Sequence, residues 1–247
     1  MSTPDENHRV LSSSLLLRPS TSVNAFEETM HRLVQSLRLG LVAPGEKLPP
    51  ERELASMLGV SRDTLREAIG ELVSSGYLLS KRGRYGGTFA ADPLPPASVT
   101  VGQDDEDAPS PGSIVDILAL REVVEVGIAR RLATMDLSGE ARERLWRAHK
   151  ECTPDDIDQY RIRDTHLHLL MGELVGAPSL VPMIADVRLE VNRLLGQIPM
   201  LKPNLEHACE QHGELLSAIL RGNAEDSARI MAEHLDGTAQ LLLGFLD

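Results

Sequence analysis

The chain has 247 residues, of which 42% are hydrophobic and only 3% aromatic. This length suits one large or two small domains, and cores built from aliphatic side chains favour helices over a β-sandwich or barrel. No apolar run approaches the ~18 residues of a membrane span, and the Ser-rich stretch 12–17 lacks the features of a signal peptide. Cys152 and Cys209 have no metal or redox spacing, so we expect them to be reduced and inert in a cytoplasmic protein without a membrane partner.

Acidic residues are unevenly distributed along a chain whose formal net charge is −12. Residues 25–90 hold nine Lys and Arg against eight Asp and Glu, whereas residues 91–247 hold 14 against 27. The acidic second part should repel DNA, but a near-neutral first part can bind phosphates if its bases share one face. We infer that the two parts have different functions.

Two stretches without helical or strand periodicity divide the chain. Residues 1–24 are rich in Ser and Thr, and we expect a disordered extension there. Residues 92–112 combine five prolines with the acidic run 104–107, a composition typical of a solvated linker. This predicts one domain at residues 25–91 and a second at residues 113–247.

The first domain shows the order of elements of a winged helix-turn-helix. A helix is expected over residues 25–39, and a short one over 50–58 with Pro50 in its first turn. After a tight turn, Ser61 caps a third helix that Gly76 ends. Strands at residues 77–79 and 88–90 then form a hairpin, the wing.

The second domain shows helical periodicity throughout, which predicts an all-α antiparallel bundle. Its six helices are expected at residues 113–134, 138–150, 155–175, 178–196, 203–221 and 224–245. Ser113, Ser138 and Asn223 are the predicted N-caps, and Pro178 and Pro203 the predicted first-turn prolines.

The first turns of a recognition helix meet base edges in the major groove of DNA. Here they carry Ser61, Arg62, Asp63, Thr64 and Arg66. Arg62 and Arg66 lie one turn apart, and arginine binds guanine through two hydrogen bonds. Ser61 and Thr64 suit phosphate or base contacts, whereas Asp63 favours the helix N-terminus or accepts from a cytosine amino group.

Further basic residues flank this helix. Arg52 is placed to hold a phosphate, and the wing tip carries Lys81, Arg82, Gly83 and Arg84, a dense charge on a flexible backbone. The alternative is a solvated basic face without a partner, but the helix-turn-helix spacing together with a basic wing favours DNA.

Four side chains of the second domain have a spacing that suits a metal. Asp164 and His168 lie four residues apart on one predicted helix, so they share a face. His212 and His234 lie equally far from residue 223, so an antiparallel hairpin places both ~16 Å from its turn, at one level. The set would suit Zn²⁺, Ni²⁺ or a similar ion with room for an exogenous ligand. Each histidine alone equally fits an ordinary core or surface residue, and His166 points to another face.

Two arginines lie on apolar-rich predicted helices of the same domain. Arg121 is a candidate ligand-binding residue, but it also fits an ordinary ion pair with Glu125 one turn on. Arg188 is a second candidate, and the alternative is an ion pair with an acid of the bundle.

The segments 44–55, 58–68 and 82–89 strongly resemble the DNA-binding domain of the GntR family of bacterial repressors. The resemblance implies DNA contacts from residues of the helix-turn-helix and wing, namely Arg52, Ser61, Arg62, Thr64, Arg66, Arg82 and Gly83. Asp63 occupies a variable position of this family, so the resemblance assigns it a part in operator choice.

The second domain resembles the effector domain of the FadR subfamily, on the segments 120–125, 164–168, 210–212 and 231–235. The resemblance implies a metal ion held by Asp164, His168, His212 and His234, and a small carboxylate effector that touches the metal, aided by Arg121. One departure is Ala177, where the subfamily has Asn before the proline. Six helices suggest the smaller of its bundle variants.

Together these features predict a homodimeric transcription regulator that binds a near-palindromic operator and is controlled by a carboxylic acid. We expect a repressor that ligand binding releases from its operator. Zinc is the expected metal, with nickel or manganese as alternatives. A metal-dependent hydrolase is the first rival, but the chain lacks an HExxH-like arrangement, so we expect no enzyme. A regulator that senses the metal itself and a structural DNA-binding protein are further rivals.

Overall fold

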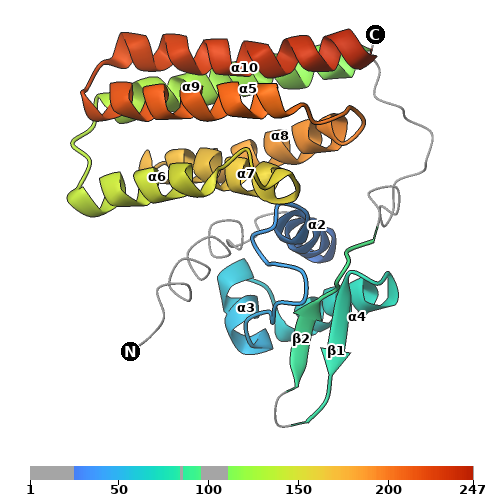
Figure 1. Ribbon diagram of the computed structural model, residues 1–247. Helices are drawn as coiled ribbons and strands as arrows, with labels where there is room; N and C mark the ends of the chain where they lie inside the picture. Colours follow the sequence, from blue (N-terminus) through green and yellow to red (C-terminus); the bar gives the residue numbers. More distant parts are fainter. Residues whose placement is uncertain (1–24, 84–85, 96–110, 247) are drawn as a thin grey trace. The chain divides into compact units, whose positions relative to one another are not determined.

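A computed structural model of the chain describes residues 25–83, 86–95 and 111–246 (Figure 1). The chain divides into two compact units, Met1–Asp105 and Glu106–Asp247. The extension predicted at residues 1–24 lies outside the described residues, as does most of the predicted linker, so the proposed domain limits remain predictions. Among the helices described, none combines the length and apolar character needed to cross a membrane.

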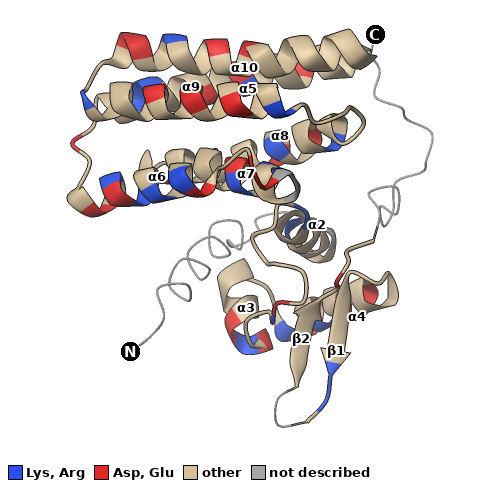
Figure 2. Ribbon diagram, in the orientation of Figure 1, with Lys and Arg blue, Asp and Glu red and all other residues tan. Residues whose placement is uncertain are grey.

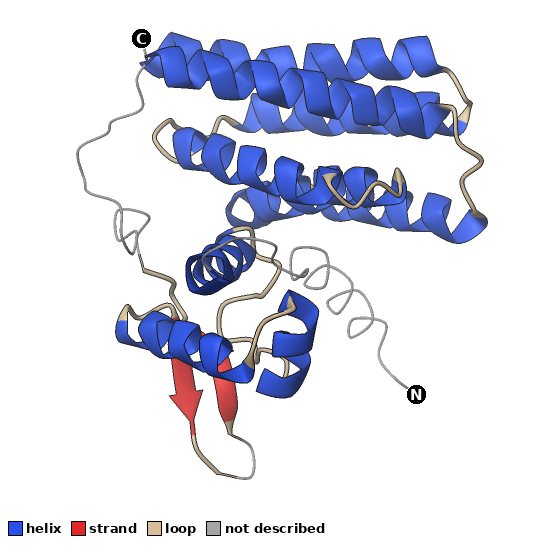
Figure 3. Cartoon of the chain, turned by 180° about the vertical axis from the view of Figure 1, so that it is seen from behind, coloured by secondary structure: helices blue, strands red, loops and turns tan. Residues whose placement is uncertain are grey.

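The first unit is a winged helix-turn-helix, as the sequence predicts. It consists of α2 (Ala25–Arg38), α3 (Glu51–Leu58), α4 (Arg62–Ser74), β1 (Leu78–Lys81) and β2 (Gly87–Ala90). The two strands pair antiparallel, with Leu78 opposite Ala90 and Lys81 opposite Gly87. Figure 3 shows them as a hairpin that follows α4. Its core is built mostly from aliphatic side chains of the three helices, together with Tyr77, Leu78 of β1 and Ala90 of β2.

The turn between α3 and α4 fixes the direction of the recognition helix. Gly59 ends α3 with φ 68° and ψ 29°, a left-handed conformation that glycine adopts without strain. The Ser61 hydroxyl accepts a hydrogen bond of 3.0 Å from the Thr64 amide, so Ser61 is the N-cap of α4, as predicted. α3 begins at Glu51, one residue later than expected, so Pro50 is its cap residue rather than its first helical residue.

The second unit is a helical bundle. The described residues form α5 (Pro111–Ala133), α6 (Gly139–Glu151), α7 (Ile157–Leu174), α8 (Leu180–Leu195), α9 (Lys202–Leu220) and α10 (Ala224–Leu246). α5 packs against α10, α8, α7 and α9, and α6 packs against α7 and α9 (Figure 1). Helices α5, α7, α8, α9 and α10 therefore enclose one interior, which contains the site described below.

Three of the predicted helix starts are confirmed. The Ser138 hydroxyl accepts a hydrogen bond of 3.1 Å from the Ala141 amide at the start of α6. The Asn223 side-chain oxygen accepts one of 3.1 Å from the Asp226 amide at the start of α10. Pro203 lies in the first turn of α9, where its missing N–H has no helical partner to lose.

Two predicted helix starts are wrong. α5 begins at Pro111, so Ser113 lies inside the first turn and is not the cap; a proline is well suited to open a helix, and it extends this one by two residues. α8 begins at Leu180 rather than Pro178. Residues 177–180 instead form a turn in which the Leu180 amide donates to the Ala177 carbonyl at 3.0 Å.

The serine caps of α6 and α8 give a matched test of these assignments. Ser138→Ala should lower the free energy of unfolding by about 1 kcal/mol, because an N-cap side chain satisfies a helix-end amide. Ser179 precedes α8 without a side-chain cap bond, so Ser179→Ala should change it by less than about 0.5 kcal/mol. Chemical unfolding followed by circular dichroism measures both, and equal losses would contradict the assignment.

Candidate metal centre

The four predicted metal-binding side chains come together in the bundle interior. Asp164 and His168 come from α7, His212 from α9 and His234 from α10. All four are buried, and one donor atom from each lies within 4.8 Å of the others. The Nε2 atoms of His212 and His234 are 3.3 Å apart, and the Asp164 Oδ1 atom is 3.4 Å from His212 Nε2 and 3.6 Å from His168 Nε2. The geometry that the spacing predicted is therefore present.

These separations fit a first-row divalent ion. Donors bound at about 2.0–2.1 Å in a tetrahedral arrangement lie about 3.3–3.4 Å apart. The buried His168 Nε2 atom has no hydrogen-bond partner among the described residues, which leaves its lone pair available to a metal. Imidazole nitrogens with one carboxylate oxygen form a donor set that zinc, nickel and manganese accept.

Neighbouring polar groups orient the imidazole rings. Glu125 Oε2 on α5 contacts His168 Nδ1, and Gln211 Oε1 lies 3.2 Å from His234 Nδ1. Partners on the second ring nitrogen fix the tautomer that presents Nε2 to a metal. The sequence analysis did not assign these roles to Glu125 or Gln211. Each of them contacts a histidine of a different helix, and that contact depends on how the helices pack.

Burial sets the protonation of two of these imidazoles. Desolvation is the main cause that holds the pKa of His212 and of His234 well below the ordinary value for histidine, and the neighbouring histidines lower both further. Burial raises the pKa of Glu125, but the contacts of Glu125 with His168 and Arg121 outweigh burial, so the pKa lies well below the usual range. His212 and His234 are therefore neutral at neutral pH, which is the form that binds metals.

Arg121 and Arg188 point into the same interior, with only 2% and 1% of their surface exposed. Arg121 Nε donates to Glu125 Oε1 at 2.9 Å, and Arg188 Nη2 pairs with Asp164 Oδ2. Both arginines thus have the acidic partners considered as alternatives. Burial, with a smaller effect of Arg121, lowers the pKa of Arg188 to about 10, so it remains charged at neutral pH.

Each of these arginines also has hydrogen-bond donors that remain unpaired. Arg121 Nη1 and Arg188 Nε and Nη1 are buried and have no hydrogen-bond partner among the described residues. Such donors are costly to leave unpaired, so they favour an anionic or polar ligand beside them.

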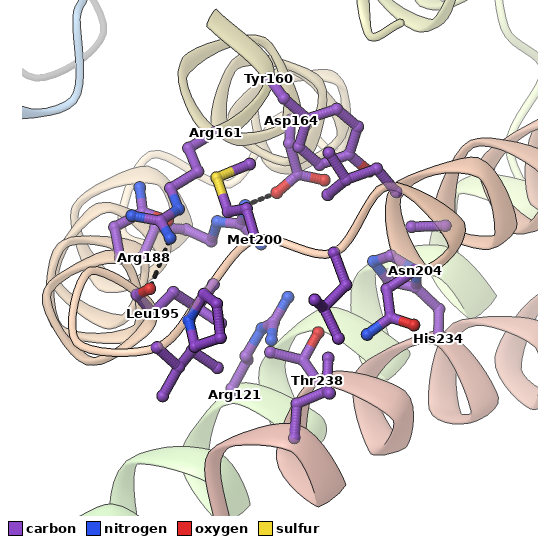
Figure 4. A pocket seen from close by; sticks show the side chains of 17 residues that line it. Arg121, Tyr160, Arg161, Asp164, Arg188, Leu195, Met200, Asn204, His234 and Thr238 are labelled. Atoms are coloured by element: carbon purple, nitrogen blue, oxygen red, sulfur yellow. Dashed lines mark hydrogen bonds and ion pairs between the residues drawn. The ribbon is translucent and has the colours of Figure 1, made fainter. Parts of the chain in front are cut away.

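A cavity of about 90 Å³ joins these groups. Arg121, Arg188, Asp164 and His234 line it together (Figure 4). About 10–15 Å³ of such space holds one water molecule, so the cavity has room for several waters or a small organic molecule. Sequence reasoning missed further polar lining residues, Tyr160, Arg161, Asn192, Asn204 and Thr238, which come from four helices and share no motif.

The predicted base-reading residues lie at the start of α4. Ser61, Arg62, Asp63 and Arg66 are exposed and Thr64 is half-buried. The hydroxyls of Ser61 and Thr64 are 2.8 Å apart and engage each other at the cap. Arg66 Nε pairs with Glu51 Oε2 at 2.7 Å on the surface, so the structure gives it an acidic neighbour that the sequence did not reveal.

The other predicted DNA contacts lie on α3 and the wing. Arg52, Arg82 and Gly83 are exposed, and Arg84 lies outside the described residues. Figure 2 shows basic residues on α3 and at the end of β1, with acidic residues beside the bases of α3. The surface around the recognition helix is thus mixed in charge rather than uniformly basic.

Comparison with known proteins identifies the family. Residues 26–89 match the bacterial regulatory proteins of the gntR family, and residues 116–237 match the FCD domain. A relative from Escherichia coli (strain K12), whose name is that of an L-lactate dehydrogenase operon regulatory protein, is 31% identical over 77% of this chain and 76% of its own. The chain belongs to the GntR family. It is a DNA-binding transcription regulator with an FCD domain.

Further relatives of this GntR regulator agree. The Uxu operon transcriptional regulator of Escherichia coli (strain K12) is 27% identical over 82% of this chain and 80% of its own. The solved structure of Escherichia coli McbR/YncC covers 92% of this chain and 100% of its own, with a TM-score of 0.53 and 19% identity. That likeness supports the fold.

Zinc binding tests the four-residue centre. His234→Ala should weaken zinc by more than the 10–100-fold that loss of an orienting partner such as Glu125 typically costs, because it removes a donor. His166→Ala, on α7 but outside the cluster, should leave zinc affinity unchanged. Competition with a chromophoric chelator gives both affinities. Equal zinc affinity in the two variants would be incompatible with the centre.

The buried histidines also predict a pH dependence of the metal-free protein. The unfolded chain protonates His212 and His234 below about pH 6.5, whereas burial keeps them neutral in the folded state. Their contribution to stability is therefore complete above this pH and is lost as the pH falls, by about 1.4 kcal/mol per pH unit for each proton. Unfolding in the presence of a chelator should show this loss as the pH falls below about 6.5. The double variant His212→Gln/His234→Gln should show a smaller one, and an equal slope would refute the assignment.

Proposed function

We propose that this GntR regulator is a repressor whose operator affinity is controlled by a small carboxylic acid bound beside a divalent metal ion. One observation carries the proposal: Asp164 and His234 of the buried Asp and His cluster line the same cavity as two buried arginines that have unpaired donors. A metal ion and two arginine side chains together form a site that recognises the carboxylate of the acid.

The metal would be held by Asp164, His168, His212 and His234. Zinc is the first candidate, since it accepts imidazole with carboxylate in a tetrahedral arrangement, and nickel and manganese are the alternatives. When bound, the ion supplies a concentrated positive charge at the wall of the cavity. The FCD match supports a metal at this position.

The effector would be an acid small enough for a cavity of about 90 Å³. Arg121 and Arg188 bind its carboxylate through their spare N–H groups, because guanidinium and carboxylate are complementary in shape and charge. The name of the relative linked to the L-lactate dehydrogenase operon points to a small hydroxy acid in that system. Lactate is therefore the first acid to test here.

The DNA contacts would come from the helix-turn-helix and the wing. The proposed residues are Arg52, Ser61, Arg62, Asp63, Thr64, Arg66, Arg82, Gly83 and Arg84. A two-fold homodimer would place two such surfaces on a near-palindromic operator in the cytoplasm. Acid binding would release DNA if the acid binds more tightly to the conformation that spaces the two recognition helices unfavourably.

An operator titration tests the proposal. An operator selected from random DNA is titrated with the metal-free and with the zinc-loaded protein, each without acid and with L-lactate or another small mono- or dicarboxylic acid. One acid should weaken operator binding several-fold in wild type, and much less in Arg121→Lys, which keeps the charge but loses the planar guanidinium group. Arg62→Ala should weaken operator binding about 5–150-fold with or without acid, a loss of ~1–3 kcal/mol. Arg147→Ala on the exposed face of α6 is its control.

The outcomes separate the rival functions. If zinc alone switches operator binding and no acid alters it, the protein senses the metal and the effector proposal is wrong. If Arg62→Ala binds the operator as tightly as Arg147→Ala does, the assignment of the recognition helix is wrong.

A further inference from the structure

The two cysteines meet in the second unit although 57 residues separate them in sequence. Cys152 directly follows α6 as its C-cap, and Cys209 lies in α9. The Cys209 Sγ atom donates a hydrogen bond of 2.9 Å to the main-chain oxygen of Cys152. Both are free thiols, and they pack with Tyr160 and Leu205 in one small cluster. The fold thus joins two nucleophilic groups that show no motif in the sequence.

The two thiols have different environments. Cys152 is buried, whereas Cys209 is half-buried and so within reach of a small solute. The neighbouring Cys152 side chain is the main cause that lowers the pKa of Cys209, whereas the Cys209 side chain and burial both raise the pKa of Cys152. Exposure and thiolate character both favour Cys209 as the attacking group and leave Cys152 as the resolving thiol.

We propose that Cys152 and Cys209 are a peroxide-sensitive pair that closes to a reversible disulfide within one chain. The Cys209 thiolate attacks one peroxide oxygen, the O–O bond breaks, and a sulfenic acid forms as hydroxide leaves. The Cys152 sulfur then attacks the sulfenic sulfur, the S–S bond forms, and the oxygen of the sulfenic acid leaves as water. Two thiols and one hydrogen peroxide thus give one disulfide and two waters. A thiol reductant restores both cysteines.

The position of the pair links it to the cavity wall. Tyr160, Leu205 and Ala208 line the cavity, and all three belong to the cluster that contains the cysteines. A disulfide would fasten the end of α6 to α9 at this wall. The pair is therefore a modification site beside the cavity, distinct from the metal-binding side chains.

Peptide mapping after peroxide treatment tests the pair. Native, metal-free wild type is exposed to hydrogen peroxide in slight excess, free thiols are blocked, and the digest is analysed by mass spectrometry. We expect a cross-linked peptide joining Cys152 and Cys209, monomeric protein on a non-reducing gel, and recovery of both thiols with dithiothreitol. Cys152→Ser should instead retain a sulfenic acid at Cys209 that a dimedone probe captures.

The variant Cys209→Ser controls for selectivity. Its Cys152 should stay reduced under the same conditions, because the remaining thiol is buried. The proposal is overturned if wild type keeps both thiols, if Cys209 proceeds to sulfinic acid while Cys152 remains free, or if the cross-link joins two chains. Circular dichroism of each variant establishes that it is folded.

Discussion

Charge compensation in an apolar interior is the constraint on which the second unit depends. Glu125, Asp164, Arg121 and Arg188 are all buried, and an isolated buried charge is too costly to persist. These charges compensate one another through a continuous series of contacts, a chain of contacts that runs from Arg121 to Glu125, to His168, to Asp164 and to Arg188. Because its members come from α5, α7 and α8, the chain of contacts fixes the register of these three helices against one another.

The same compensation couples the proposed metal to the proposed acid. The two arginines and two carboxylates of this chain of contacts balance, and burial keeps His212 and His234 neutral. A divalent ion would leave the interior with two uncompensated positive charges, which an anionic ligand neutralises. Arg121 and Arg188, which have unpaired donors, line the cavity where that ligand would lie. Metal and carboxylate should therefore strengthen each other's binding, since each lowers the cost of burying the other.

Sequence reasoning succeeded where the chain's local geometry decides the outcome. Four-residue spacing placed Asp164 beside His168, and symmetry about residue 223 placed His212 beside His234, because helix pitch and a short turn determine both. It failed where helices remote in sequence decide. The contact of Glu125 with His168 and the meeting of the two cysteines depend on lateral packing, which no periodicity encodes. Helix ends fall between these cases: Ser138 caps as predicted, but an earlier proline displaced Ser113 from its expected role.

The charges of the first unit lie on its surface rather than in its interior. Its surface near the recognition helix pairs acids with bases, as in the contact of Arg66 with Glu51, so non-specific attraction to phosphates is weak. An exposed ion pair of this kind is worth no more than about 1 kcal/mol, whereas two hydrogen bonds from arginine to the correct guanine gain ~1–3 kcal/mol. In the proposed DNA complex, Arg66 would therefore gain by leaving Glu51 only where the matching base is present. A mixed surface of this kind favours the operator over bulk DNA.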